Sequence, residues 1–217
     1  EYIANWETNK DTAYKVEYYI EELDGTYTLK ETENLQGETG IDVFADFHVD
    51  SGFTENKAHP DRIEYGTIKP DGSLVLKLYY SRNEVTLALV KGDYIATVEG
   101  AGTYKIGKKV TVTATLEASA TGYTNSFTGW TSESTVTIEN ASSSSAIVTI
   151  PASNVTITAN GTRTANSDTP YVVYHYLENA EDEKYTIVGS EETKYGTSDS
   201  TISIATLSKV VTNPVIL

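Results

Sequence analysis

Cysteine is absent from this sequence of 217 residues, and basic residues are few. Without cysteine the chain can form neither a disulfide framework nor a CxxC metal site, and it has no thiol nucleophile. Its 31 acidic residues against 16 basic ones give a formal charge of -15, which repels the phosphate backbone of a nucleic acid and an anionic lipid surface. We therefore expect no nucleic-acid partner.

Long apolar runs are also missing. No stretch approaches the roughly 18 apolar residues that a membrane span requires, and the segment EYIANWETNK lacks the basic and apolar regions of a signal peptide. The sequence predicts no membrane span in this chain, and any export signal would lie outside it. The absence of cysteine, together with abundant Thr, Ser, Tyr and Gly, suits an extracellular bacterial protein.

Catalytic and metal-ligating residue types do not form recognisable motifs. His48, His59 and His175 are far apart and belong to no HExxH motif, and the sequence contains no GxSxG motif. Acidic clusters, such as the one at residues 21–24, lack the alternating Asp/Asn pattern of an EF-hand. We predict no enzyme, no cofactor and no metal site, and we leave open weak Ca²⁺ binding and a Lys-Asn isopeptide bond.

The stretch from Ile63 to Tyr80 has the clearest pattern of two strands joined by a turn. Pro70-Asp71-Gly72 separates two β-rich runs, with Pro fixing φ and Gly allowing a positive φ. Leu74, Leu76 and Leu78 alternate with other residues, which predicts one buried face of a hairpin. The predicted packing partners of these leucines are Ile41, Phe44 and either Tyr14 or Val16.

The residues before this stretch predict two strands and a short helix. The run YKVEYYI alternates from Tyr14, and Asp24-Gly25 turns the chain into a second alternating run, TYTLKETE. Thr39 and Asp42 have the spacing of a capping box, and the apolar spacing that follows predicts a helix over residues 40–48. Residues 12–82 thus predict a small α+β unit such as a β-grasp.

Residues 83–165 predict a separate all-β domain. Thr- and Val-rich runs, among them VTLALV, KVTVTATLEA and NVTITA, are separated by short turns that contain Gly, Asn or Pro. The hydrophobic period and the residue usage change at Arg82-Asn83-Glu84. We therefore expect a domain boundary with a small interface at this point.

The pattern of the first unit begins again at Thr169. Residues of the first unit recur 157 positions later: Thr12, Tyr14, Val16, Tyr19 and Glu21 correspond to Thr169, Tyr171, Val173, Tyr176 and Glu178. We interpret residues 166–217 as an incomplete second β-grasp-like module. Residues 1–11 are interpreted as the closing strand of a preceding repeat. We expect strand pairing by at least one of the segments 1–8 and 209–217, within the chain or with a neighbouring molecule.

Tyrosine is the residue type best suited to ligand binding here, with sixteen copies. Alternation places one member of each pair, Tyr18-Tyr19 and Tyr79-Tyr80, on the core side, so packing is the favoured interpretation and ligand contact the alternative. The candidate ligand contacts are Tyr19, Tyr80 and Trp6, whereas Trp130 is expected in the core.

Two segments resemble known families. Segment 14–82, with YYIEELDGTYTLKETENLQGETG and GTIKPDGSLVLKLYYSRN, resembles the mucin-binding-protein-like and internalin B-repeat-like modules of Gram-positive surface proteins. Segment 84–164, with GTYKIGKKVTVTAT, GYTNSFTGW and VTIPASNVTITAN, resembles the divergent internalin B-repeat. The resemblance implies a β-grasp-like first module, a small β-rich second module and a role in a wall-associated stalk or adhesin. Neither motif carries a catalytic residue of its family.

The chain departs from these families at three places: the irregular loop 49–60, Gly161 in place of a closing Trp, and the incomplete third unit. The predicted fold is mainly β with a minor α+β component. The predicted function is a non-enzymatic, extracellular stalk or adhesin segment on a bacterial cell wall. One alternative is a module that binds a host glycan, mucin or protein, and the other is a filament subunit that exchanges strands with copies of itself.

Overall fold

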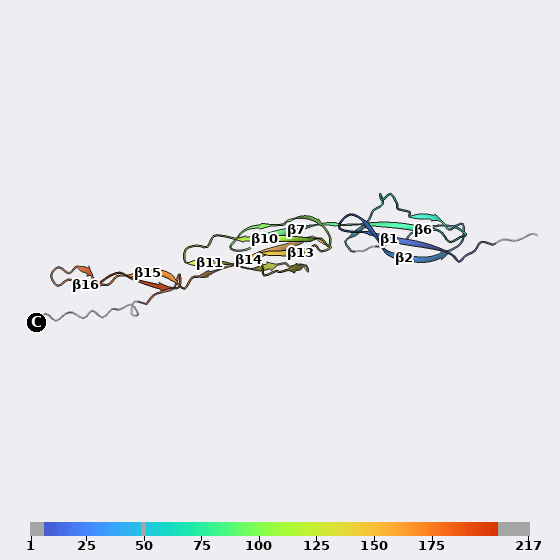
Figure 1. Ribbon diagram of the computed structural model, residues 1–217. Coiled ribbons are helices and arrows are strands. Elements are labelled where there is room, and N and C mark those ends of the chain that lie inside the picture. The colour runs from blue at the N-terminus through green and yellow to red at the C-terminus, as the bar shows by residue number, and fades with distance from the viewer. Residues whose placement is uncertain (1–6, 49–50, 204–217) are drawn as a thin grey trace, which may run out of the picture.

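The computed structural model describes residues 7–48 and 51–203, and every regular element in this part of the chain is a β-strand. The strands form three groups that follow one another along one direction in space (Figure 1). We call them the first unit (residues 12–82), the middle unit (residues 84–165) and the last unit (residues 166–203). No described segment forms a helix long and apolar enough to cross a membrane.

The first unit is built on one mixed sheet with the strand order β2-β1-β6-β4. Its strands are β1 (Thr12–Glu21), β2 (Tyr27–Gly37), β4 (Phe53–Glu55) and β6 (Val75–Arg82). The turn at Gly25, which has a φ of 88°, joins β1 to its antiparallel partner β2, as the sequence predicts. On its other side β1 pairs in parallel with β6. Alternate side chains of these two central strands form the core on one face of the sheet.

The helix predicted over residues 40–48 is wrong. Part of this segment forms β3 (Asp42–Phe44), which pairs with β5 (Tyr65–Thr67) in a separate two-stranded ribbon. Ile41 and Phe44 follow helical spacing in the sequence, but they are 52% and 68% exposed. The partner strand satisfies the backbone groups that a helix would have satisfied internally. The predicted minor α component is therefore not seen, and the β-grasp arrangement is not confirmed.

The predicted hairpin at residues 63–80 is confirmed at its turn and at one antiparallel bridge, between Ile63 and Lys77, but not as a ladder between two strands. The turn is present, because the Gly72 N–H donates to the Lys69 carbonyl at 2.9 Å and Gly72 has a φ of 71°. However, β5 pairs with β3, whereas β6 pairs with β1 and β4. The predicted burial of Leu74, Leu76 and Leu78 is confirmed at 8%, 0% and 2% exposure. Of their predicted partners, Tyr14 and Val16 join this core and the exposed Ile41 and Phe44 do not.

The middle unit consists of two four-stranded sheets with a core shared between them, so the all-β prediction for this segment is confirmed. One sheet has the order β12-β13-β10-β8, from β8 (Ile95–Glu99), β10 (Lys109–Leu116), β12 (Thr137–Glu139) and β13 (Ser145–Thr149). The other has the order β11-β14-β7-β9, from β7 (Glu84–Lys91), β9 (Gly102–Lys105), β11 (Tyr123–Thr131) and β14 (Val155–Ala165). Trp130 lies in this core, as predicted, and its indole N–H donates to the Ser143 carbonyl at 3.0 Å.

The last unit repeats the hairpin of the first unit. Its strands are β15 (Thr169–Val173), β16 (Tyr176–Glu178), β17 (Tyr185–Ile187) and β18 (Glu192–Gly196). Thr169 lies opposite Gly196, as Thr12 lies opposite Gly37. Glu178 likewise lies opposite Tyr185, as Glu21 lies opposite Tyr27. The internal repeat seen in the sequence is thus also a repeat of backbone register.

The predictions about the termini fall largely on residues outside the described part. Residues 1–6 and 204–217 are not described, so the predicted pairing of segments 1–8 and 209–217 stays a prediction. Within the predicted closing strand 1–11, the described residues 7–11 contain no strand. Asn9 instead forms a turn, in which its side-chain Oδ1 accepts the Asp11 N–H at 3.0 Å.

Candidate functional site: two junctions and a polar groove

Arg82, the last residue of β6, connects the first unit to the middle unit. Its Nε–H donates to the Glu21 carbonyl at 2.5 Å, and its NH1 group donates to the Ile106 carbonyl at 3.3 Å. Glu21 belongs to the first unit and Ile106 to the middle unit, so one guanidinium bridges them. The planar group presents several donors in fixed directions, which suits it to this position.

The Glu21 carboxylate is the second connection across this junction. It accepts the Arg82 backbone N–H at 2.9 Å and the Lys105 Nζ at 2.6 Å, and its side chain is 12% exposed. Burial alone would raise the pKa of the Glu21 carboxyl, but the hydrogen bonds from Lys105 and Arg82 outweigh it, so this pKa lies below its ordinary value. The carboxylate is therefore held in its charged form between the two units.

Backbone and apolar contacts complete this first junction. The Asn83 N–H donates to the Gly52 carbonyl at 2.9 Å, and the Asn83 carbonyl accepts the Ile106 N–H at 3.1 Å. Phe53 packs against the cores of both units, and the Arg82 guanidinium lies 5.0 Å from its ring centroid. Gly52 has a φ of 87°, and a Cβ added there would collide with the Ile106 side chain. Asn83, the residue between the two units, thus forms a backbone hydrogen bond with each of them.

A second junction joins the middle unit to the last unit at Gly122. The Gly122 carbonyl accepts the Asn166 N–H at 2.8 Å and the Ser198 hydroxyl at 2.6 Å. The Ser198 and Thr169 hydroxyl groups lie 2.6 Å apart, and the Tyr123 hydroxyl donates to the Asp199 carboxylate. A Cβ added at Gly122 would collide with Ser198 Oγ. Glycine is therefore required where the two units meet.

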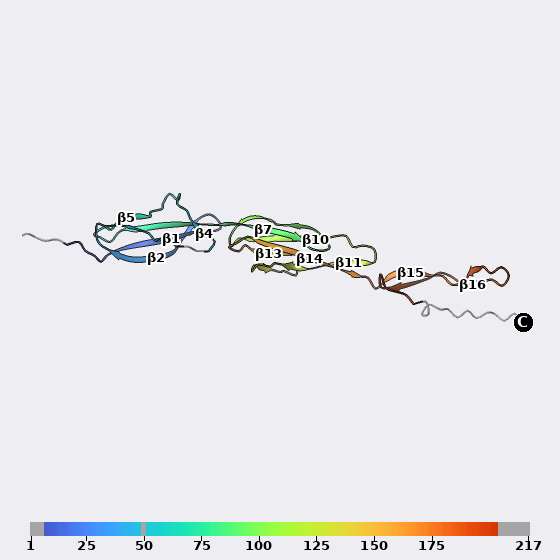
Figure 2. The ribbon, with the colours of Figure 1, turned by 180° about the vertical axis from the view of Figure 1, so that it is seen from behind.

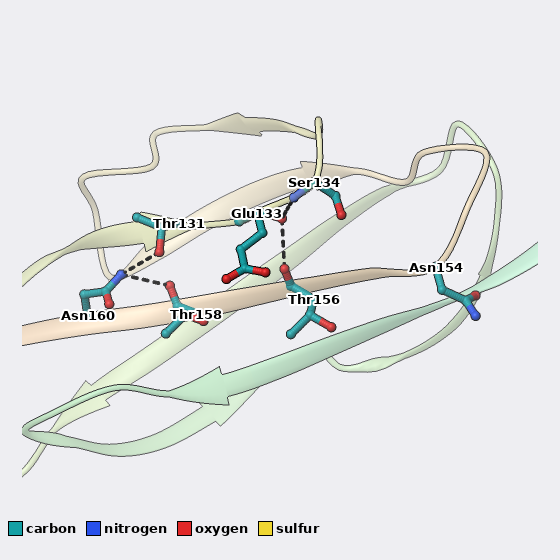
Figure 3. A pocket seen from close by; sticks show the side chains of 8 residues that line it. Thr131, Glu133, Ser134, Asn154, Thr156, Thr158 and Asn160 are labelled. Atoms are coloured by element: carbon teal, nitrogen blue, oxygen red, sulfur yellow. Dashed lines mark hydrogen bonds between the residues drawn. The ribbon is translucent and has the colours of Figure 1, made fainter.

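A polar groove of about 690 Å³ lies on the middle unit, along β14 (Figure 3). Alternate positions of β14 and the residue before it contribute amide and hydroxyl groups, and the loop after β11 forms the other side. The lining residues are Thr131, Ser132, Glu133, Ser134, Asn154, Thr156, Thr158 and Asn160. The Asn160 amide donates to Thr131 Oγ1 at 3.0 Å, and Ser132 Oγ donates to the Thr156 carbonyl at 2.9 Å. The groove can hydrogen-bond a polar ligand, and Glu133 is the one ionisable side chain among its eight lining residues.

The structure describes two of the three predicted ligand-contact residues and gives them different surroundings. Tyr19 stacks on Tyr79 at 4.7 Å between ring centroids, and its hydroxyl donates to Glu17 at 2.7 Å, which together with burial raises the pKa of Tyr19 to about 12. Tyr80 lies in the core at 3% exposure, and its hydroxyl accepts the His48 N–H at 3.1 Å. Trp6 lies outside the described residues. Ligand contact stays a prediction for all three, and partial exposure favours Tyr19 over Tyr80.

His48 and His59 each pack their ring on a tyrosine ring. His48 stacks on Tyr18 at 4.1 Å, with its Nε2 3.3 Å from a Glu33 oxygen, and His59 stacks on Tyr79 at 3.7 Å. Within the residues that the structure describes, no group of three or more His, Asp or Glu side chains is placed to hold a metal ion. These histidines therefore serve as packing partners in the first unit.

Sequence reasoning missed both junctions. Arg82 marks the point where residue usage changes, and Glu21 belongs to an acidic turn and to the internal repeat, but neither pattern predicts a contact between units. The signal that could have located the second junction is the repeat itself, because Thr12 and Thr169 are equivalent. Sequence reasoning also missed the ribbon pair Phe44 and Tyr65, whose rings stack at 5.5 Å on the surface of the first unit.

The comparisons with known proteins concern the middle unit. Residues 85–165 match the family model of the divergent InlB B-repeat domain, and they coincide with strands β7 to β14. This segment is therefore similar to internalin B-repeats, in agreement with its sequence resemblance. The search of curated proteins found no match. The mucin-binding-like and β-grasp-like character of residues 14–82 stays a prediction.

Proposed function

We propose that this chain is a non-enzymatic stalk segment of a repetitive bacterial surface protein. The similarity of residues 85–165 to the divergent InlB B-repeat domain supports a surface repeat module. The proposal adds an extracellular, wall-associated location. The stalk carries a distal part of the protein away from the cell. Its mechanism is mechanical, since the units are small, β-rich and joined end to end.

The observation that supports this function best is the first junction. Flexible linkers leave neighbouring domains free to reorient, whereas here Arg82, Glu21 and Lys105 join two units through partly buried, charge-assisted hydrogen bonds. The units extend in a row in both views of the chain (Figure 2). The charge of -15 further opposes side-by-side association of stalks.

Small-angle X-ray scattering of the full chain tests this proposal. The unmodified chain should scatter as an elongated, stiff particle whose cross-section is that of one unit. The double variant Glu21→Ala, Arg82→Ala should scatter as a more flexible chain. Lys109→Ala is the matched control, because Lys109 forms an exposed ion pair with Glu139 inside the middle unit. A compact particle, or equal flexibility in all three proteins, would contradict the proposal.

Recognition of a host glycan is a second candidate function, favoured by two surfaces. The groove along β14 offers hydroxyl and amide groups, and the stacked Phe44 and Tyr65 rings offer an exposed aromatic face of the kind that packs on sugars. A glycan array probed with the full chain tests this candidate. Signal that is lost in Tyr65→Ala or Thr158→Ala, but retained in the Lys109→Ala control, would support binding, and an array without signal would reject it.

A further inference from the structure

The first unit contains a copy of the surface that receives Gly122 in the last unit. In the last unit, the Asn166 carbonyl accepts the Ser198 N–H at 2.9 Å, and the Thr169 and Ser198 hydroxyl groups lie 2.6 Å apart. These bonds place the Asn166 N–H and the Ser198 hydroxyl group side by side at the end of the sheet. Both groups donate to the same Gly122 carbonyl.

The same contacts recur in the first unit. The Asn9 carbonyl accepts the Thr39 N–H at 2.8 Å, and the Thr12 and Thr39 hydroxyl groups lie 2.6 Å apart. The turn that follows is also shared: the residue after Thr39, Gly40, has a φ of 86°, and the residue after Ser198, Asp199, has a φ of 58°. Asn9, Thr12 and Thr39 therefore reproduce these hydrogen bonds of Asn166, Thr169 and Ser198 at the same places relative to the hairpin register.

The glycine that ends the hairpin lies against the equivalent tyrosine in both copies, although the nearest side chain is that of Ile68 at Gly37 and that of Ile202 at Gly196. A Cβ added at Gly37 would lie 3.7 Å from the Tyr14 ring, and one added at Gly196 would lie 3.4 Å from the Tyr171 ring. Tyr14 and Tyr171 are equivalent in the repeat. The agreement thus extends from the backbone to one neighbouring side chain, the tyrosine, and is not limited to a shared turn.

We propose that Asn9, Thr12 and Thr39 form a docking surface for the Gly122 loop (residues 120–123) of another unit built like the middle unit. The Asn9 N–H and the Thr39 hydroxyl would donate to the glycine carbonyl, as the Asn166 N–H and the Ser198 hydroxyl do. This inference rests on the proposed end-to-end stacking and names the partner of the first unit.

The occupant is a second unit of this kind and not the chain's own middle unit. The chain's own Gly122 carbonyl already accepts two hydrogen bonds from the last unit. In that junction Asn166 directly follows Ala165, the last residue of β14. A divergent-repeat unit whose last strand ends directly before Asn9 would reach the docking surface with the same spacing. Two contacts differ. Gly40 stands where Asp199 accepts the Tyr123 hydroxyl, and the Asn9 side-chain oxygen accepts the Asp11 N–H, whereas that of Asn166 accepts the Thr124 hydroxyl.

An extended chain tests the proposal. A second copy of residues 84–165 is joined directly to Asn9 of residues 9–217, and hydrogen exchange at the Asn9 amide is measured by NMR against the unmodified chain, in which Thr8 precedes Asn9. The Asn166 amide in the same molecule is the internal reference. We expect the added unit to slow exchange of the Asn9 amide by about tenfold or more, because the amide becomes hydrogen-bonded in a buried contact.

Two variants of the extended chain sharpen the result. Thr39→Val removes the hydroxyl group with little change of shape and should restore fast exchange at Asn9, whereas Thr32→Val on the exposed face of β2 is the matched control and should not. Gly122→Ala in the added copy alone should also restore fast exchange. Fast exchange at Asn9 with a protected Asn166 amide would overturn the docking surface and leave the stalk proposal standing. Fast exchange at both amides would overturn the two proposals together.

Discussion

The first and last units share one hairpin register, yet they differ in what covers the hairpin. In the first unit β1 pairs with β2 on one side and β6 on the other, and Val16 and Tyr18 are 0% and 2% exposed. In the described part of the last unit, the equivalent strands have one partner each, and Val173 and His175, the equivalents of Val16 and Tyr18, are only partly buried. Hairpin register is thus set by neighbouring residues, whereas burial depends on a strand supplied from distant sequence.

The largest effect should come from removing the side chain that makes this difference. Leu76 on β6 is fully buried, so Leu76→Ala should lower the free energy of unfolding of the first unit by about 3 kcal/mol. Ile187→Ala in the last unit is the matched control, with an expected loss below about 0.5 kcal/mol because Ile187 is exposed. Urea denaturation of the full chain measures both. Equal losses in the two variants would show that the buried face has been misassigned.

A smaller effect is expected at the first junction. Arg82→Ala removes the donors to the Glu21 and Ile106 carbonyls and the positive charge beside the Glu21 carboxylate, in a partly buried position, so it should destabilise the chain by about 2 kcal/mol. The exposed Lys109–Glu139 pair gives the comparison, since Lys109→Ala should cost less than about 0.5 kcal/mol. Denaturant unfolding followed by tryptophan fluorescence distinguishes the two. A loss at Arg82 no larger than that at Lys109 would mean that the junction contributes nothing beyond a surface ion pair.

The junction should also weaken in acid. The pKa of Glu21 in the folded chain lies below its ordinary value of 4.5, so the unfolded state binds the proton more readily. The stabilisation is therefore complete above pH 4.5 and is lost as the pH falls through the lower, folded pKa. Unfolding measured between pH 7 and pH 3 should show a smaller pH dependence in Glu21→Gln than in the unmodified chain. Identical pH profiles would argue against a charged Glu21 at the junction.

The smallest effect concerns the stacked pair of Tyr19 and Tyr79 in the first unit. Tyr19→Phe removes the hydroxyl that donates to Glu17 while keeping the ring stacked on Tyr79, so the stability change should be below about 0.5 kcal/mol. In an alkaline titration followed by tyrosinate absorbance, the variant should lose a component near the pKa of about 12. Loss of an early-titrating component instead would place Tyr19 in open solvent.

The sequence predicted those features that depend on neighbouring residues. Alternation located the buried leucines of β6, and Asp24-Gly25 located the turn between β1 and β2. The same local patterns misled at residues 40–48, because apolar spacing there fits a helix, while the actual partner of β3 is the distant strand β5. Turn residues also located the bend at Gly72 but carried no information on which strands pair across it.

The junctions were beyond prediction for a related reason. Glu21, Arg82 and Lys105 are far apart in sequence, and each residue alone resembles an ordinary surface charge. The equivalence of Thr39 and Ser198 was hidden because short insertions shift the repeat after β16. The division of the chain into separately folding domains at residue 83 stays a prediction, and Phe53, which contacts both cores, makes the boundary a packed one.

The most direct test of the stalk account is the distance between spin labels on the first and middle units. Because the chain has no cysteine, Asn34→Cys on β2 and Thr111→Cys on β10, both exposed, give the only two labelling sites. Pulsed electron resonance should show one narrow distance distribution, which broadens when Arg82→Ala is added. A distribution that is already broad in the chain with intact Arg82 would contradict the claim that this junction fixes the two units end to end.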